Sequence, residues 1–165
     1  MNLFCFGLGY CADNLSSKLI KQGWQVSATC RTSEKAAVLE ASGIRPVLLS
    51  GKKVTVTDLG KADHILISVP PEQDGSDPVL NFAEAALAAL QDQIKWVGYL
   101  STTGVYGDHQ GAWIDEETPA GLLSERGQRR VAAEAQWAAT GLPMHYFRLA
   151  GIYGPGRNSI RALQN

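Results

Sequence analysis

The residues that point most directly to a chemistry are three small ones near the start of the sequence. Gly7, Gly9 and Ala12 form a Gly-x-Gly-x-x-Ala pattern between a predicted strand, 3–6, and a predicted helix, 10–22. Gly7 permits a tight turn, Gly9 lets a pyrophosphate approach the backbone, and Ala12 lets the helix pack on the strand. Free amides and the helix dipole then stabilise phosphate charge. A plain structural turn is the alternative interpretation. The context favours a dinucleotide site at Gly7, Leu8, Gly9, Tyr10, Cys11 and Ala12.

The end of the second predicted strand, 24–30, bears on which dinucleotide fits. An Asp or Glu about 20 residues after the glycines binds the ribose 2′-hydroxyl of NAD, and this sequence has neither there. Arg31 instead offers planar donors suited to a 2′-phosphate, with Thr32 and Ser33 as further donors. The sequence therefore favours NADP and leaves NAD open. An exposed loop arginine is the alternative interpretation of Arg31.

Strands and helices must alternate to position such a site, and the sequence predicts that they do. Short apolar runs are expected to form strands at 3–6, 24–30, 45–49, 64–69, 95–101 and 144–149. Helical patterns are expected at 10–22, 33–41, from 78 onward and at 125–140, whereas 50–59 is expected to be irregular or a short strand. This alternation predicts an α/β fold, a Rossmann-like doubly wound parallel sheet of at least six strands with helices on both faces.

Length and composition bound the remaining possibilities. The 165 residues suggest one domain, expected to span 1–165, and the net charge of -1 gives no general attraction to nucleic acid or anionic membrane. No apolar run approaches the ~20 residues of a membrane helix. The three cysteines have no metal-ligand spacing. We therefore expect a cytoplasmic protein without a metal, a nucleic-acid partner or a membrane partner.

Two later motifs resemble the extended short-chain dehydrogenase/reductase superfamily, especially its nucleotide-sugar epimerase and dehydratase branch. They are Leu100–Gly107 (Leu-Ser-Thr-Thr-Gly-Val-Tyr-Gly) and Phe147–Gly156 (Phe-Arg-Leu-Ala-Gly-Ile-Tyr-Gly-Pro-Gly). The resemblance implies that Thr102, three residues before Val105, hydrogen-bonds the reacting oxygen. It also implies that two further segments line the cofactor, with residues Ser68, Val69, Pro70, Ala150 and Gly151.

The same family carries Tyr-x-x-x-Lys four residues ahead of a Glu, and this sequence departs from that pattern. Counting back from Glu134 places the two positions at Arg126 and Arg130. An arginine, whose pKa lies above about 12, cannot replace the tyrosine as acid or base. Arg130 is a candidate for the lysine's hydrogen bonds to the cofactor ribose. A solvated helix face is the alternative interpretation of both arginines. Other candidate proton donors are Tyr106, Tyr153 and His109, although a structural role in a tight turn is favoured for the two tyrosines and a solvent-exposed position for His109.

The expected function is therefore that of an NAD(P)-binding oxidoreductase or an epimerase/dehydratase-like protein. The resemblance implies an unknown carbonyl or nucleotide-sugar substrate and leaves a homodimer open. The alternative is a non-catalytic NAD(P)-binding sensor or interaction protein that lost the proton shuttle. Members of the family continue beyond the sixth strand into a substrate-binding part. That part is expected to be missing here, because 159–165 resembles the start of a helix without a stop signal.

Overall fold

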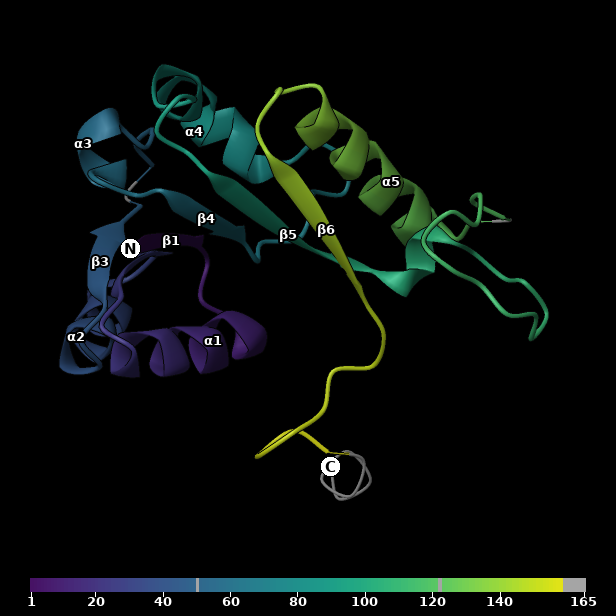
Figure 1. The fold of residues 1–165 in the computed structure, drawn as a ribbon, viewed down its shortest axis with the longest axis horizontal. Helices are drawn as coiled ribbons and strands as arrows, with labels where there is room; N and C mark the ends of the chain where they lie inside the picture. The colour runs from purple at the N-terminus through teal and green to yellow at the C-terminus, as the bar shows by residue number, and fades with distance from the viewer. Residues whose placement is uncertain (50, 122, 159–165) are drawn as a thin grey trace.

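One sheet of six parallel strands runs through the molecule (Figure 1). The structure is a computed structural model that describes residues 1–49, 51–121 and 123–158, so the helix expected at 159–165 lies outside the described residues. The strands are β1 (Asn2–Phe6), β2 (Gln25–Cys30), β3 (Arg45–Leu48), β4 (His64–Ile67), β5 (Trp96–Thr102) and β6 (Met144–Leu149). Their order is β3-β2-β1-β4-β5-β6. After β3 the chain crosses back to β4, so the strand order reverses at the point between the neighbouring strands β1 and β4. Ligands of such sheets bind beyond the carboxyl ends of the strands at this switch point.

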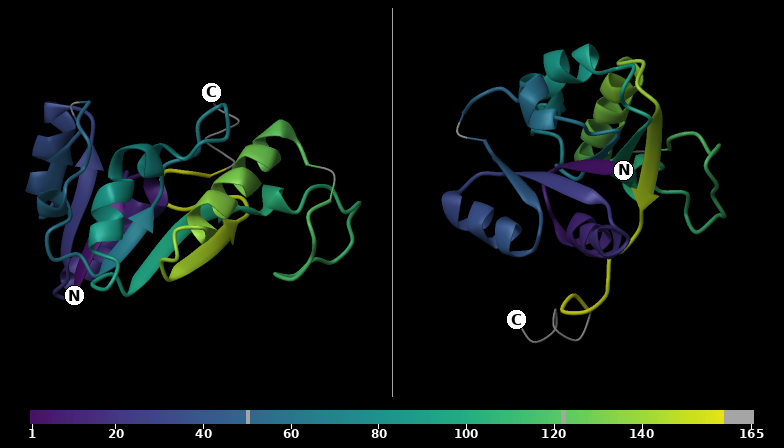
Figure 2. Two further views of the ribbon diagram at one scale, coloured as in Figure 1. Left: turned by 90° about the horizontal axis from the view of Figure 1, so that it is seen from above. Right: turned by 60° about the vertical axis from the view of Figure 1, so that its left-hand side comes forward.

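Helices cover both faces of the sheet, which confirms the predicted doubly wound fold (Figures 1 and 2). They are α1 (Tyr10–Lys21), α2 (Ser33–Ala41), α3 (Val56–Leu59), α4 (Pro78–Ala89) and α5 (Glu125–Ala138), with a 3-10 turn η1 at Thr103–Val105. Helices α1 and α2 lie on one face, and α3, α4 and α5 lie on the other. Within the described ranges, no helix is long and apolar enough to span a bilayer.

Strand β1 shows how the two faces form separate cores. Phe4 and Phe6 point to the α4 and α5 side, where their ring centroids lie 4.9 Å apart within a cluster that includes Trp137. Leu3 and Cys5 point to the opposite side, among residues of β2, α1 and α2. Successive side chains of a strand alternate between faces. A buried parallel strand therefore needs the continuous apolar run that made β1 recognisable in the sequence.

Short polar signals set where the helices begin. Asp77 accepts a hydrogen bond from the Val79 amide at 2.9 Å, and Pro78 occupies the first turn of α4, where a missing N–H costs nothing. Helix α2 is capped by Thr32, whose Oγ1 accepts from the Lys35 amide at 3.2 Å. Helix α2 has the bounds that the sequence predicts, 33–41, and its cap is the residue before them. Thr32 therefore lies at the helix start and two residues after the end of β2.

The expectation of an irregular or stranded segment at 50–59 is wrong for residues 56–59, which form α3. A reciprocal cap starts this helix: the Thr55 amide donates to Asp58 Oδ2 at 2.8 Å, and the Asp58 amide donates to Thr55 Oγ1 at 3.2 Å. Four residues are too few for helical periodicity to show in a sequence. The Thr-x-x-Asp pair, a variant of the capping box, was the available signal. Residue 50 is outside the described part of the chain.

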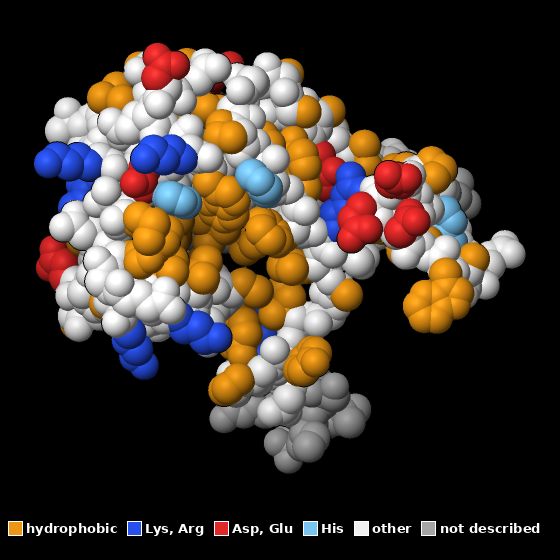
Figure 3. Space-filling model, viewed as in Figure 1, with side chains coloured by type: hydrophobic (Ala, Val, Ile, Leu, Met, Phe, Trp, Pro, Cys, Tyr) orange, Lys and Arg blue, Asp and Glu red, His pale blue; other side chains and the backbone are white. Residues whose placement is uncertain are grey.

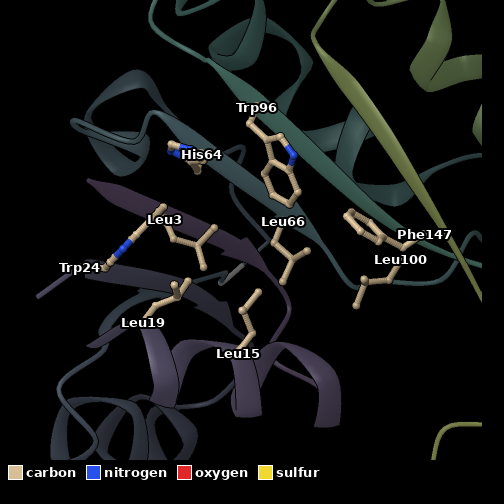
Figure 4. A pocket seen from close by; sticks show the side chains of 9 residues that line it. All are labelled: Leu3, Leu15, Leu19, Trp24, His64, Leu66, Trp96, Leu100 and Phe147. Atoms are coloured by element: carbon tan, nitrogen blue, oxygen red, sulfur yellow. The ribbon is translucent and has the colours of Figure 1, made fainter. Parts of the chain in front are cut away.

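The α1 side of the sheet carries an apolar groove that no described helix covers. Hydrophobic side chains gather in a hollow near the centre of the molecule in Figure 3, and Figure 4 shows the groove at close range. Its volume is about 450 Å³. It is lined by Leu3, Leu15, Leu19, Trp24, His64, Leu66, Trp96, Leu100 and Phe147. None of these residues belongs to the predicted cofactor site, although Leu100 also lines a cavity at that site.

Candidate functional site

The two glycines of the turn after β1 serve different ends. Gly7 has φ +76°, and a Cβ atom there would lie 3.0 Å from Val69 Cγ2 and 3.1 Å from Ser68 Oγ. The Gly7 amide also donates to Thr29 Oγ1 at 2.8 Å, which fixes the turn to β2. Gly9 has an extended backbone (φ -83°, ψ -176°), and a Cβ atom there would meet nothing within 4 Å. The fold therefore requires glycine at position 7, whereas the space beside Gly9 is open to a ligand.

Helix α1 begins directly at this turn with its amide groups available. Gly9 is the N-cap residue, and no side-chain hydrogen bond caps the helix within the described part of the chain. Ala12 is fully buried against the β1 and β2 core that contains Cys5 and Ala28. A larger side chain at Ala12 would push the helix off the strand. Unpaired amides and the positive end of the helix dipole together favour an anion beside Gly9.

Two cavities adjoin the glycine turn, and sixteen of the residues that the sequence predicts for the site line one or the other; Ser33 is in neither described lining. The first, of about 320 Å³, is lined by the predicted residues Gly7, Leu8, Arg31, Thr32 and Val69. The second, of about 430 Å³, is lined by the predicted residues Gly9, Tyr10, Cys11, Ala12, Ser68, Pro70, Thr102, Arg126, Arg130, Ala150 and Gly151. Strand order brings most of these segments together, because they lie at or after the carboxyl ends of β1, β2, β4, β5 and β6. Arg126 and Arg130 come instead from helix α5.

Two positively charged side chains line the first cavity, and only one of them was predicted from the sequence. Arg31 and Lys35 both line it, and neither side chain has a hydrogen bond or ion pair with any described residue. Lys35 lies in the first turn of α2, four residues after Arg31. Burial raises the pKa of the nearby Cys30 thiol, and the charge of Lys35 opposes that rise. The i, i+4 spacing of Arg31 and Lys35 at a predicted helix start was the signal that could have revealed the second cation.

In the second cavity, Arg130 is fixed against the sheet. Its Nη1 donates to Tyr99 Oη at 3.0 Å and to the Leu100 carbonyl at 3.3 Å, and its Cζ lies 5.5 Å from the centre of the Tyr99 ring. Burial raises the pKa of Tyr99 to about 12, so this phenol stays neutral. Arg130 is half-buried. These contacts hold its guanidinium at the wall of the cavity.

The first turn of α5 packs tightly on the turn that follows β5. A Cβ atom at Gly127 would lie 2.7 Å from the Gly104 carbonyl oxygen, so only glycine permits this approach. Thr102 ends β5, and its Oγ1 accepts from the Gly104 amide at 3.2 Å. The close contact therefore brings Arg126, the residue before Gly127, to the cavity wall that Thr102 also lines.

The other candidate proton donors lie outside the described lining of both cavities. Tyr106 is buried, and its Oη accepts from Arg148 Nη1 at 3.1 Å. His109 Nε2 lies 3.0 Å from the Tyr106 carbonyl oxygen, and Tyr153 is exposed. The contacts of Tyr106 and His109 fit the structural alternative, whereas the exposure of Tyr153 places it away from both cavities.

A residue that sequence reasoning missed, Arg157, also lines the second cavity. Its Cζ lies 5.7 Å from the centre of the Tyr10 ring, and Tyr10 Oη donates to the Pro155 carbonyl at 3.2 Å. These contacts fold the segment after β6 over the start of α1. Nothing in the sequence indicated that residues 145 positions apart along the chain would meet here.

A partly buried ion pair lies beneath the wall of the second cavity. Arg148 Nη2 lies 2.9 Å from Glu134 Oε2, and the Ser101 hydroxyl donates to the same carboxylate. The carboxylate and the Tyr106 hydroxyl raise the pKa of Arg148 further above its ordinary value. The pair links β5, β6 and α5. In the sequence, Glu134 served only to fix the positions of Arg126 and Arg130, and nothing there indicated a role for Arg148.

Protein YeeZ from two strains of Escherichia coli is similar in sequence to this chain. No protein-family model matches the sequence. Protein YeeZ of Escherichia coli K12 is 32% identical over 167 residues, which cover 94% of this chain and 60% of YeeZ. The chain therefore spans about three fifths of the length of this curated relative.

Solved structures share the fold. A conserved protein of unknown function from Silicibacter pomeroyi DSS is 48% identical, with a TM-score of 0.88, over 98% of this chain and 56% of its own. UDP-glucuronic acid 4-epimerase from Bacillus cereus, solved in complex with NAD, is 18% identical, with a TM-score of 0.72, over 93% of this chain and 58% of its own. At 18% identity the epimerase shows a common Rossmann-like fold and nothing finer.

Proposed function

We propose that residues 1–165 form the dinucleotide-binding domain of an NADP-preferring oxidoreductase or epimerase/dehydratase related to the extended short-chain dehydrogenases. One observation carries the proposal. Two cavities adjoin a single glycine turn, and sixteen of the residues predicted for the site line one or the other. A dinucleotide spanning both would place its pyrophosphate beside Gly9 and the start of α1. The complex of the Bacillus cereus epimerase with NAD supports a dinucleotide on this fold.

The preference for NADP is argued from the charges of the first cavity. Arg31 and Lys35 line it without an acidic partner within the described residues. A 2′-phosphate on the adenosine ribose would supply two negative charges to them. NAD lacks that phosphate, and this chain lacks the acidic residue that binds the free ribose 2′-hydroxyl.

In the second cavity, this chain's residues would orient the reacting groups. The Thr102 hydroxyl is positioned to donate a hydrogen bond to a substrate oxygen, since its own oxygen accepts from Gly104. Arg130 has five N–H groups and uses only Nη1 for Tyr99 and Leu100, so other donors remain for the cofactor ribose. The nicotinamide, when bound, would supply hydride transfer.

A second candidate function is a sensor that binds the dinucleotide without turnover. The specific observation in its favour is Arg126, which stands where the resemblance expects a proton-transferring tyrosine and cannot perform that role. None of the other phenols or histidines considered lines the described cavity. Measuring NADPH absorbance with a panel of carbonyl compounds and nucleotide sugars, together with product analysis for redox-neutral epimerisation or dehydration, separates the two. Substrate-dependent oxidation or conversion of a substrate to product supports the enzyme, and binding without any turnover supports the sensor.

Isothermal titration with NADPH and NADH tests the proposal. We expect both to bind, and NADPH to bind more tightly. Equal affinities would remove the preference for NADP, and no binding of either dinucleotide would overturn the proposed function. A Gly9→Val variant serves as the matched control, because it closes the space beside the turn and keeps every charge.

A further inference from the structure

The second cavity carries more positive charge than its described lining offsets. Arg126, Arg130 and Arg157 line it, and no aspartate or glutamate is among the described lining residues. The acids nearest in α5 are engaged elsewhere. Glu125 pairs with Arg129 at 3.4 Å, and Glu134 pairs with Arg148. The cavity therefore attracts anions.

The three arginines differ in what already holds them. Arg130 is bonded to Tyr99 and to the Leu100 carbonyl. Arg157 lies over the Tyr10 ring at the start of α1, on the side of the proposed pyrophosphate. Arg126 has no hydrogen bond, ion pair or ring contact with any residue in the described ranges. It is therefore the cation whose charge neither the fold nor the proposed cofactor accounts for.

The position of Arg126 assigns it to a second ligand beside the cofactor. It lies in the first turn of α5, where the helix dipole adds positive potential. Its neighbour Gly127 packs on Gly104, so Arg126 shares the wall of the cavity that Thr102 lines. A guanidinium presents two parallel N–H groups that match the two oxygens of a carboxylate or a phosphate.

We propose that the substrate of this site carries a carboxylate or phosphate group and that Arg126 binds that group next to Thr102. This inference rests on the proposed function, because it places the anion beside a bound dinucleotide. Arg126 then acts as a binding residue that selects anionic substrates. Its guanidinium takes no part in proton transfer.

The test uses simple anions as probes on protein saturated with NADPH. Malonate and inorganic phosphate are titrated by calorimetry, with neutral malonamide as the uncharged match for malonate. We expect the unmodified chain to bind at least one anion and to ignore malonamide. The anion that binds more tightly shows whether Arg126 prefers a carboxylate or a phosphate group. Failure of both anions to bind, or equal binding of malonamide, would overturn the inference.

Variants on the same helix locate the binding. Arg126→Gln should weaken the bound anion by about 10- to 100-fold, the loss of one charge-assisted hydrogen-bonding group. Arg129→Gln is the matched control. It removes the same charge three residues further along the helix, and the Arg129 side chain is outside the described lining of the cavity. Equal affinities in these two variants would overturn the inference.

A repeat without dinucleotide separates this inference from the function it rests on. If NADPH fails to bind the unmodified chain, the proposed function is overturned. An Arg126-dependent affinity for malonate or phosphate in that protein would still support the anion site. If NADPH binds and Arg126→Gln keeps its anion affinity, the inference alone is overturned.

Discussion

Gly9→Val should abolish dinucleotide binding and leave the fold intact. A Cβ atom at Gly9 meets nothing within 4 Å, and the extended backbone suits a β-branched residue. Two opposing effects on the free energy of unfolding are expected. Losing glycine stabilises by about 0.4–1 kcal/mol through the unfolded state. Valine is a poorer N-cap for α1, at a cost of about 1 kcal/mol. The net change should therefore stay within about 1 kcal/mol.

The loss of binding should be much larger. The valine side chain would occupy the space that the pyrophosphate needs to reach the amides of α1. Losing two charge-assisted hydrogen bonds at about 1.5–3 kcal/mol each removes about 3–6 kcal/mol of binding free energy. That is a loss of more than about 100-fold in affinity.

Gly7→Ala gives the contrasting case. Position 7 has φ +76° and lies against Val69 and Ser68, so alanine there should cost at least about 1–2 kcal/mol of stability. Urea unfolding and calorimetric titration of NADPH are measured on both variants. Unchanged NADPH affinity in Gly9→Val would refute the reasoning, as would a stability loss as large as that of Gly7→Ala.

Arg31→Asp should weaken NADPH more than NADH by about 1.5–3 kcal/mol in calorimetric titrations; equal losses would contradict a contact with the 2′-phosphate. Cys11 is half-exposed and lines the second cavity, whereas burial raises the pKa of Cys5 to about 12. Cys11 should therefore be alkylated by iodoacetamide before Cys5, and NADPH should slow its alkylation in mass spectra; no protection would place the dinucleotide elsewhere. Arg148→Met leaves the Glu134 carboxylate without its cation and should lower the free energy of unfolding in urea by about 3 kcal/mol; a loss below about 1 kcal/mol would show that the pair contributes little.

Much of the fold was predictable because its signals are local. A parallel strand buried on both faces needs an uninterrupted apolar run, as in β1 and β4, and caps such as Asp77 mark helix starts. Strand β6 was predicted with both ends as observed, Met144–Leu149. Helix α3 was missed because four residues show no period. The 3-10 turn at Thr103–Val105 was missed because it continues directly from a strand.

The site was predictable to the extent that its residues follow strand ends. The segments at Gly7, Arg31, Ser68, Thr102 and Ala150 all do, and parallel strands bring such segments to one edge of the sheet. Contacts between side chains of distant segments could not be predicted in this way.

Three such contacts shape the site. The bond from Arg130 to Tyr99, the pair of Arg148 with Glu134 and the contact of Arg157 with Tyr10 each depend on how a helix or loop packs over the sheet. No spacing along the chain encodes them. Sequence reasoning therefore found the walls of the cavities and missed what holds their cations in place.

The most direct test of the central claim is a crystal structure of the chain with NADPH. We predict the pyrophosphate beside Gly9 and the first amides of α1, the 2′-phosphate between Arg31 and Lys35, and the nicotinamide in the second cavity near Thr102 and Ala150. A dinucleotide bound in any other place, such as the apolar groove on the α1 side of the sheet, would contradict the account.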